Sequence, residues 1–328
     1  MGKRRSLMAA LALVVFGAVG SGSAGAQTFP NRPIKLVVPH APGGNSDAFG
    51  RILAQRLSER LGQQVVVENR TGAGGTIGSA SVARAAPDGY TLLVADNGTH
   101  AIAKTLYGVK LQYDVVKDFT SITLAALFPT VLLVHPSVPA RTIGEFVALA
   151  KSQPGKLTFS SAGTGNGSHL ALEMFTHSAG PLQMIHVPYK GGSPAVQALI
   201  AGEVQMTAVS VNTSLPHINS GRARALALSG TRRSPALPDL PTLSESGIAK
   251  AEVDNWLAVV GPAGMPAEVV ARLNSEIAAA LNTPETRQRL AGLGLDVLAS
   301  SPTQYTKVLE ADIVTWGEAV KRSGATSD

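Results

Sequence analysis

Short apolar runs, Gly- and Pro-rich turns and amphipathic segments alternate along the chain. Residues 36–38 are Leu-Val-Val and predict a buried strand, which two prolines and a pair of glycines then end. Apolar residues recur at steps of three and four over residues 49–61, which predicts a helix that Gly62 closes. Either Ser46 or Asp47 is expected to cap the N-terminus of that helix. A strand, a tight loop and a helix are therefore predicted in that order.

The same alternation continues through the rest of the chain and predicts an α/β fold. Further strands are predicted at residues 65–67, 90–95, 157–161, 204–211, 223–229 and 256–260, with helices between most of them. Strands that alternate with helices favour a parallel sheet. Two apolar runs with little polar punctuation, residues 122–127 and 131–134, predict a crossing into a second domain.

The two expected lobes are not each one continuous stretch of sequence. Residues 256–260 return as a buried strand that leads into helices lacking sheet partners of their own. One lobe is therefore expected to contain residues 27–126 and 250–328, and the other residues 127–249. The last helix carries an apolar stripe that is typical of a core face.

Residues 1–26 have the features of a cleaved secretory signal. Three basic residues precede an apolar run of 13 residues, and Ala24-Gly25-Ala26 has the form of a signal-peptidase site. The apolar run is too short to span a bilayer comfortably. We therefore expect an exported protein of two domains, since about 300 residues remain after cleavage.

Composition and charge exclude several classes of partner. The net charge of +6 includes three basic residues of the signal, and the other charges are scattered along the chain. A net charge this small and this scattered does not indicate nucleic acid or a membrane surface as a partner. The chain has no Cys, which excludes disulfides and a Cys-linked lipid anchor. We expect no direct membrane insertion after signal cleavage.

Five predicted strand ends carry Gly, Ser, Thr, Asn or His, which indicates a polar cleft shared by two α/β domains. Backbone N–H groups at a helix N-terminus suit a carboxylate or phosphate, although any single turn could use Gly and Pro for geometry alone. The loop after residue 161 is not a dinucleotide fingerprint, because counting from Gly163 places Ser168 where the last Gly belongs. It also lacks the Gly-Lys-Ser/Thr end of a P-loop. The loops therefore favour a small carboxylate over a nucleotide.

Catalytic signals are weaker than binding signals. The sequence has no G-x-S-x-G elbow, no H-E-x-x-H motif and no clustered metal-ligand spacing, so neither a metal nor a cofactor is expected. His40, His100, His169 and His186 are candidate general bases, but nothing in the sequence pairs one of them with a nucleophile. The alternatives left open are an exported hydrolase, with His169 or His40 as base and a Ser as nucleophile, and a ligand-sensing subunit of a signalling system.

Six motifs, in order along the chain, carry a family resemblance. They are Phe29-Pro30-Asn31-Arg32-Pro33-Ile34, Val38-Pro39 with Pro42-Gly43-Gly44 and Asp47, Glu68-Asn69-Arg70 with Gly72-Ala73-Gly74-Gly75, Pro87-Asp88-Gly89-Tyr90-Thr91-Leu92, Val187-Pro188-Tyr189-Lys190-Gly191, and Leu240-Pro241-Thr242 with Glu245 and Gly247. Together they resemble the substrate-binding receptors of tripartite tricarboxylate transporters, the Bug family of periplasmic solute-binding proteins. The resemblance spans essentially the whole chain after the signal.

The resemblance implies a type II periplasmic-binding-protein fold, in which two α/β lobes close around a small organic acid. It implies a receptor in the periplasm that is not an enzyme, binds no cofactor, is a monomer and hands its ligand to membrane transporter subunits. By position, the implied ligand-binding residues are Pro39, His40, Ala41, Gly43, Gly44, Ser46, Asp47, Asp96, Asn97, Thr99, Ser160, Ser161, Ala162, Gly163, Thr164, Gly165, Ser168, His169, Tyr189, Lys190, Ser210 and Asn212.

Two features of these residues bear on the ligand. Many members carry Phe or Tyr soon after the first strand, whereas this chain has Pro39-His40-Ala41, which leaves room for a charged or larger ligand. Asp47 is either a ligand contact or a helix cap. Only Lys190 brings a fixed positive charge to the five loops, so we expect backbone amides and hydroxyls to hold the carboxylate.

Overall fold

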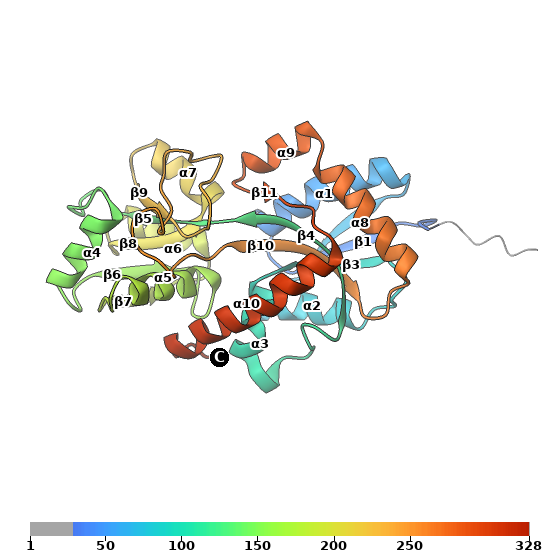
Figure 1. The fold of residues 1–328 in the computed structure, drawn as a ribbon, viewed down its shortest axis with the longest axis horizontal. Coiled ribbons are helices and arrows are strands. Elements are labelled where there is room, and N and C mark those ends of the chain that lie inside the picture. The colour runs from blue at the N-terminus through green and yellow to red at the C-terminus, as the bar shows by residue number, and fades with distance from the viewer. Residues whose placement is uncertain (1–28, 328) are drawn as a thin grey trace, which may run out of the picture. The chain divides into compact units, whose positions relative to one another are not determined.

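The protein folds into two α/β lobes, each built on its own sheet (Figure 1). The computed structural model describes residues 29–327, so the predicted signal at residues 1–26 lies outside the described residues. The first sheet has the order β11-β4-β10-β3-β1-β2 and the second the order β7-β6-β8-β5-β9. The strands of the first sheet are β1 (Ile34–Val38), β2 (Val65–Asn69), β3 (Thr91–Asp96), β4 (Phe119–Phe128), β10 (Asn255–Pro262) and β11 (Asp296–Val297). Those of the second sheet are β5 (Thr130–Val134), β6 (Thr158–Ser161), β7 (Ile185–Pro188), β8 (Met206–Ser210) and β9 (Arg224–Leu228).

The sheets are mixed, so the expectation of a parallel sheet is only partly right. β1 is parallel to β2 and β3, and β6 is parallel to β7 and β8. β10, by contrast, is antiparallel to both β3 and β4, and β5 is antiparallel to β8 and β9. Strands that pass between sheets, or return from the other sheet, do not need a crossover helix and are free to pair antiparallel.

The chain passes from one sheet to the other and back again. β4 ends at Phe128 and β5 begins at Thr130, so Pro129 alone separates a strand of the first sheet from one of the second. The return runs through residues 229–254 into β10. The second sheet is built entirely from residues between these two crossings.

Helices pack around both sheets. In the first lobe they are α1 (Asn45–Leu61), α2 (Thr76–Ala83), α3 (Ala103–Tyr107), α8 (Ala267–Leu281), α9 (Pro284–Ala291) and α10 (Pro302–Ser323). In the second lobe they are α4 (Ile143–Ser152), α5 (Gly167–Ser178), α6 (Gly192–Ile200) and α7 (Val211–Asn219). Within residues 29–327, none of these helices has the length and apolarity that a membrane span requires.

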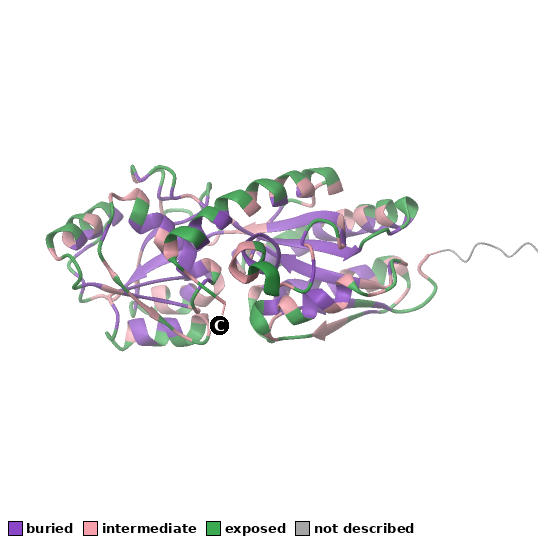
Figure 2. Ribbon diagram, turned by 90° about the horizontal axis from the view of Figure 1, so that it is seen from below, coloured by how far each residue is buried: buried purple, intermediate pink, exposed green. Residues whose placement is uncertain are grey.

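The central strands are buried, as their apolar sequences predict (Figure 2). Every residue of β10 is buried, and so are the last five residues of β3. Each fully buried Leu or Val side chain contributes about 1.5–3 kcal/mol relative to an exposed one. These strands therefore form a rigid base for the loops that follow them.

The end of α1 was predicted correctly, and its start was not. Gly62 closes the helix in the left-handed conformation, with φ of 65°. At the other end Gly44 is the N-cap and makes no side-chain cap, so the expected cap by Ser46 or Asp47 is wrong. The Asp47 carboxylate lies one turn into the helix and turns back to accept from the backbone N–H of Gly43 at 3.0 Å.

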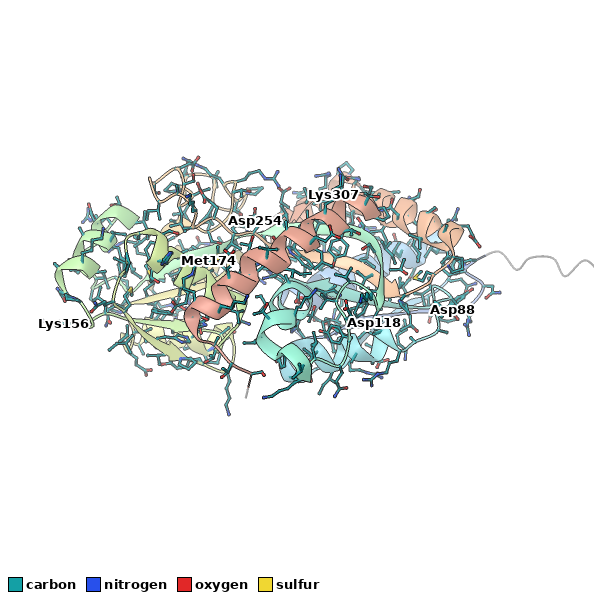
Figure 3. The ribbon with its side chains drawn as sticks, turned by 60° about the horizontal axis from the view of Figure 1, so that its bottom comes forward. Asp88, Asp118, Lys156, Met174, Asp254 and Lys307 are labelled. Carbon is teal, nitrogen blue, oxygen red and sulfur yellow. The ribbon has the colours of Figure 1, made fainter. Side chains whose placement is uncertain are left out.

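Helix α10 holds the lobes together through the predicted apolar stripe. Tyr305, Leu309 and Trp316 are buried in one cluster with Trp256 of β10. Met174 of α5, a second-lobe helix, belongs to the same cluster and lies beside α10 (Figure 3). The last helix of the chain therefore packs on both lobes.

A single polar contact fixes α10 on β10, and its loss should be measurable. Trp256 Nε1 donates to Asp312 Oδ2 at 2.6 Å. Asp312→Ala should leave this buried N–H without an acceptor and lower the free energy of unfolding by about 1–3 kcal/mol. Denaturant unfolding measures the change. Glu310→Ala, at an exposed position of the same helix, is the control, and an equal loss in both variants would contradict the assigned role.

Candidate functional site

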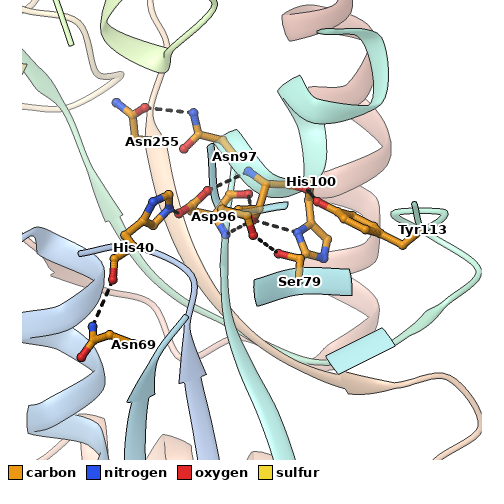
Figure 4. A network of polar contacts seen from close by, with 10 residues as sticks. His40, Asn69, Ser79, Asp96, Asn97, His100, Tyr113 and Asn255 are labelled. Atoms are coloured by element: carbon orange, nitrogen blue, oxygen red, sulfur yellow. Dashed lines mark hydrogen bonds and ion pairs between the residues drawn. The ribbon is translucent and has the colours of Figure 1, made fainter. Parts of the chain in front are cut away.

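The site begins where two parallel strands of the first lobe end side by side. β1 pairs with β3 in parallel, so the residues that follow both strands meet at one edge of the sheet. His40 follows β1 and Asp96 ends β3, and His40 Nε2 lies 2.5 Å from Asp96 Oδ2 (Figure 4). The second oxygen of Asp96 accepts from the backbone N–H of Thr99 at 2.8 Å. Both oxygens of this buried carboxylate are thus occupied.

The two members of this pair shift each other's protonation. Burial alone would lower the pKa of His40, but the charge of Asp96 and the hydrogen bond to it outweigh burial and raise the pKa. Burial would raise the pKa of Asp96, but His40, the Thr99 N–H and His100 outweigh it and lower the pKa. Both shifts favour the ion pair between a protonated His40 ring and an ionised Asp96 carboxylate.

The rest of the 96–100 loop, where Asn97 and Thr99 were predicted to bind ligand, is largely a buried support. Residues Gly98–Ile102 form a helical turn that runs directly into α3. Thr99 and His100 are fully buried, and Thr99 Oγ1 lies 3.0 Å from His100 Nδ1. Burial lowers the pKa of His100 to about 4, so this ring is neutral at pH 7. Thr99 thus holds Asp96 in place from below the surface.

The first loop presents free backbone amides. Ala41, Pro42, Gly43 and Gly44 are exposed. Asp47 accepts from Gly43 N–H, from Asn69 Nδ2 at 2.9 Å and from Arg51, and these contacts outweigh burial to lower its pKa. Among the described residues, the N–H groups of Gly44, Asn45 and Ser46 have no hydrogen-bond partner. The start of α1 is therefore an open site for an anion.

Most predicted hydroxyls of the second lobe shape their loops. Ser160 and Ser161 are fully buried, and Ser160 Oγ donates to the carbonyl of Ala195 at 3.0 Å. Ser168 Oγ accepts from Ala162 N–H at 3.0 Å, and the Ser168 N–H donates to Asn166 Oδ1 at 2.9 Å. The Asn166 side chain is thus the N-cap of α5.

Two histidines of the second lobe form a stack. His169 lies on His186 with ring centroids 3.9 Å apart, and its Nδ1 accepts from Gly165 N–H at 3.2 Å. His186 Nε2 lies 2.7 Å from the hydroxyl of the buried Ser161, and burial lowers the pKa of His186 to about 4. In the described part of the chain neither His40 nor His169 contacts a Ser hydroxyl, so the base–nucleophile pair that the hydrolase alternative requires is not formed.

A cavity of about 380 Å³ brings residues of both lobes together. Thr164, Tyr189 and Lys190, three of the predicted ligand-binding residues, line it from the second lobe. Leu106 and Tyr107 of α3 line it from the first lobe, and Thr326 and Ser327 complete its wall. Lys190 is exposed, and among the described residues it has no ion-pair partner. The Tyr189 hydroxyl points elsewhere, since it donates to Glu203 at 3.1 Å.

The start of α5 meets the first lobe at a second point. Asn97 Nδ2 donates to Asn255 Oδ1 at 3.0 Å (Figure 4). A Cβ added at Gly167 would lie 2.9 Å from Asn255 Oδ1, so only glycine fits between α5 and this pair. Asn255 Nδ2 is buried and has no partner among the described residues. This unused donor at the lobe junction is available to a ligand or water.

Sequence reasoning missed Asn255, Leu106 and Tyr107. Asn255 is a polar residue at the first position of a fully buried strand. A polar side chain in a buried strand conflicts with the apolar pattern, and this conflict could have marked Asn255 as a functional residue. Ser210 and Asn212 were predicted but do not line the cavity, because the Ser210 hydroxyl donates to Asn212 Oδ1 at 2.5 Å within their own loop. Residues 29–327 contain no cluster of three or more metal-ligating side chains.

Comparison with known proteins agrees with this arrangement. A family model described as "Tripartite tricarboxylate transporter family receptor" matches residues 49–325. A protein encoded in a tcbD-tcbE intergenic region of a Pseudomonas species is 39% identical, over 97% of this chain and 94% of its own length. BugT of Bordetella pertussis is 33% identical, over 97% of this chain and 98% of its own length.

Two solved structures are also similar to this chain in fold and in sequence. Rpa4515 of R. palustris, solved with adipate, has a TM-score of 0.82 at 34% identity and covers 91% of this chain and 99% of its own. MatC of Rhodopseudomonas palustris, solved with bound malate, has a TM-score of 0.77 at 33% identity and covers 89% of this chain and 100% of its own. Both span the two lobes described above.

The His40–Asp96 pair should make stability depend on pH. The pKa of His40 lies above 6.5 when folded, so its contribution is full below pH 6.5 and is lost as the pH rises through the folded pKa. The pKa of Asp96 lies below 3.8, so that contribution is lost as the pH falls through the folded value. His40→Gln should therefore cost most between about pH 4 and 6.5, by about 1–2 kcal/mol after discounting for the partly exposed ring.

Thermal melts of the wild type and His40→Gln from pH 4 to 9 measure this difference. It should shrink as the pH rises through the folded pKa of His40, because the wild-type ring then loses its proton. A difference that stays constant across this range would contradict the ion pair.

Proposed function

Because the chain belongs to the tripartite tricarboxylate transporter receptor family, we propose that it captures a small carboxylate between its lobes and delivers it to membrane transporter subunits. Members of this family are periplasmic solute-binding proteins. The observation that carries the proposal is the cavity of about 380 Å³ between Leu106 and Tyr107 of one lobe and Thr164 and Lys190 of the other. Its volume falls in the range of about 300–1,000 Å³ that small-molecule sites occupy.

Two solved relatives support a carboxylate as the ligand. Adipate and malate, which those relatives hold, are both dicarboxylates. In this chain the free amides of Gly44, Asn45 and Ser46 stand at the N-terminus of α1, where the helix dipole favours negative charge. Lys190 adds a solvated positive charge on the opposite lobe. A dicarboxylate that touches both lobes fits this distribution.

Binding without turnover is the expected activity. Ser161 is the hydroxyl that approaches His186, yet it is fully buried, and the low pKa of His186 reflects a ring that holds a proton weakly. A general base and an accessible nucleophile are both needed for acyl transfer. His169 and His186 therefore serve packing and loop geometry.

The proposal includes the organisation of the mature protein. Residues 1–26 would direct export to the periplasm and be removed, and the protein would act as a monomer. The lobe boundaries would fall close to residues 126 and 250, since β4 ends at Phe128 and β10 begins at Asn255.

A panel of mono-, di- and tricarboxylates, including adipate and malate, should identify ligands by thermal stabilisation. A ligand that binds only the folded state adds about 2.7 kcal/mol at one hundred times its dissociation constant. Product analysis of each stabilising acid should recover it unchanged. Turnover of any of these acids, or no stabilisation by the whole panel, would contradict the proposal.

The role of the α1 amides can be isolated at one position. Proline is favoured at the first position of a helix, so Asn45→Pro should keep α1 while it removes one N–H, and Asn45→Ala keeps that N–H. Asn45→Pro should bind the best ligand about tenfold more weakly than Asn45→Ala, the loss expected for one hydrogen bond to a charged group.

Lys190→Ala tests the alternative mechanism, in which a side-chain cation rather than backbone amides holds the carboxylate. Its exposed charge should contribute under about 1 kcal/mol, so the dissociation constant should rise less than in Asn45→Pro. Calorimetric titration compares the three variants. A larger loss in Lys190→Ala would contradict the amide mechanism.

A further inference from the structure

His40 is held at one ring nitrogen and open at the other. Nε2 is bound to Asp96, and Nδ1 makes no hydrogen bond within residues 29–327. The buried side-chain atoms that lack a partner do not include Nδ1, and the His40 side chain is 36% exposed, so Nδ1 reaches solvent. The imidazole thus joins a buried carboxylate to an open position at the edge of the first sheet (Figure 4).

We propose that His40 donates its Nδ1–H to a carboxylate of the bound ligand, so that the imidazolium bridges Asp96 and the ligand and the receptor takes up a proton on binding. The inference rests on the proposed function and names a selectivity residue of the same site. It assigns to His40 the discrimination between a carboxylate and a neutral group at this position.

The turn Ala73–Gly75 lies next to the His40 ring and next to one residue of the cavity wall. A Cβ added at Gly75 would lie 3.1 Å from His40 Cε1, and one added at Gly74 would lie 2.9 Å from the Tyr107 hydroxyl. Tyr107 in turn lines the cavity with Thr164 and Lys190. The turn Ala73–Gly75 is therefore a neighbour of both His40 and Tyr107, so His40 and one wall of the cavity flank the same short turn.

The charges around His40 favour a protonated ring when a ligand carboxylate binds beside it. Asp96 is the acidic group that contacts the ring, and His100 lies behind it and is neutral at pH 7. From α1, Asp47 approaches through Asn69, which donates to both Asp47 and the His40 carbonyl, but Arg51 neutralises Asp47. The turn Ala73–Gly75 and helix α2 bring no titratable group.

Without the proton, a ligand carboxylate beside this ring would face the negative charge of Asp96 with no positive charge between them. With the proton, one imidazolium pairs with two carboxylates, and each hydrogen bond is charge-assisted. Ligand and Asp96 thus both favour the protonated ring, and the pKa of His40 should rise further on binding. Linkage then makes affinity fall as the pH rises above the pKa of the free receptor.

Calorimetric titration with adipate and with malate, at several pH values from 6 to 9, tests the inference. The wild-type dissociation constant should rise by up to about tenfold per pH unit above the pKa of His40. Titrations in two buffers of different ionisation enthalpy should show net proton uptake by the wild type in that interval. His40→Gln should bind more weakly at pH 6 and lose both the pH dependence and the proton uptake.

Two further variants complete the test. His177→Gln, at an exposed position of α5, should keep the wild-type profile. Asp96→Asn can still accept from the Thr99 N–H but removes the counter-charge, so the fall in affinity should move to lower pH. This variant provides the readout if His40→Gln does not fold.

The outcomes separate the two proposals. Binding of either acid with no pH dependence in the wild type, or with the same dependence in His40→Gln, overturns the role of His40 and leaves the receptor function intact. Failure of every acid in the carboxylate panel, adipate and malate included, to bind the wild type at any of these pH values counts against the proposed function itself, and the role of His40 falls with it.

Discussion

The first lobe depends on the insertion of β10 between β3 and β4. β10 pairs with Asp96 of β3 on one side and with Phe128 of β4 on the other, so the sheet is incomplete until the chain has built the second lobe and returned. All of its residues are buried, and Trp256 joins it to α10. The stability of the first lobe is therefore tied to contacts between residues far apart in sequence.

The same insertion assembles the ligand site. β10 begins at Asn255, which receives a hydrogen bond from Asn97 and lies against Gly167 at the start of α5. The parallel pairing of β1 and β3 places His40 against Asp96 at the neighbouring edge. Strand pairing thus decides which polar groups meet, and the lobes approach each other through rigid elements, with α5 touching the first lobe directly.

Local sequence patterns predicted the helices and strands better than they predicted the roles of the polar side chains. The strand over residues 36–38 and the end of α1 at Gly62 follow from short-range pattern and a single left-handed glycine. Thr99 was predicted to contact ligand and is instead fully buried beneath Asp96, because sequence does not say which side of a loop its hydroxyl faces. Asn255 was missed because its partners come from distant segments.

The loops of the site use most of their Ser and Thr hydroxyls to hold their own backbone, and for this reason we propose that amides and His40 recognise the ligand. A crystal structure of the protein with malate or adipate tests this account most directly. It should show one carboxylate between His40 Nδ1 and the amides at the start of α1, with the rest of the ligand reaching the wall formed by Thr164 and Lys190. A carboxylate held by Lys190 and second-lobe groups alone, away from His40 and α1, would contradict it.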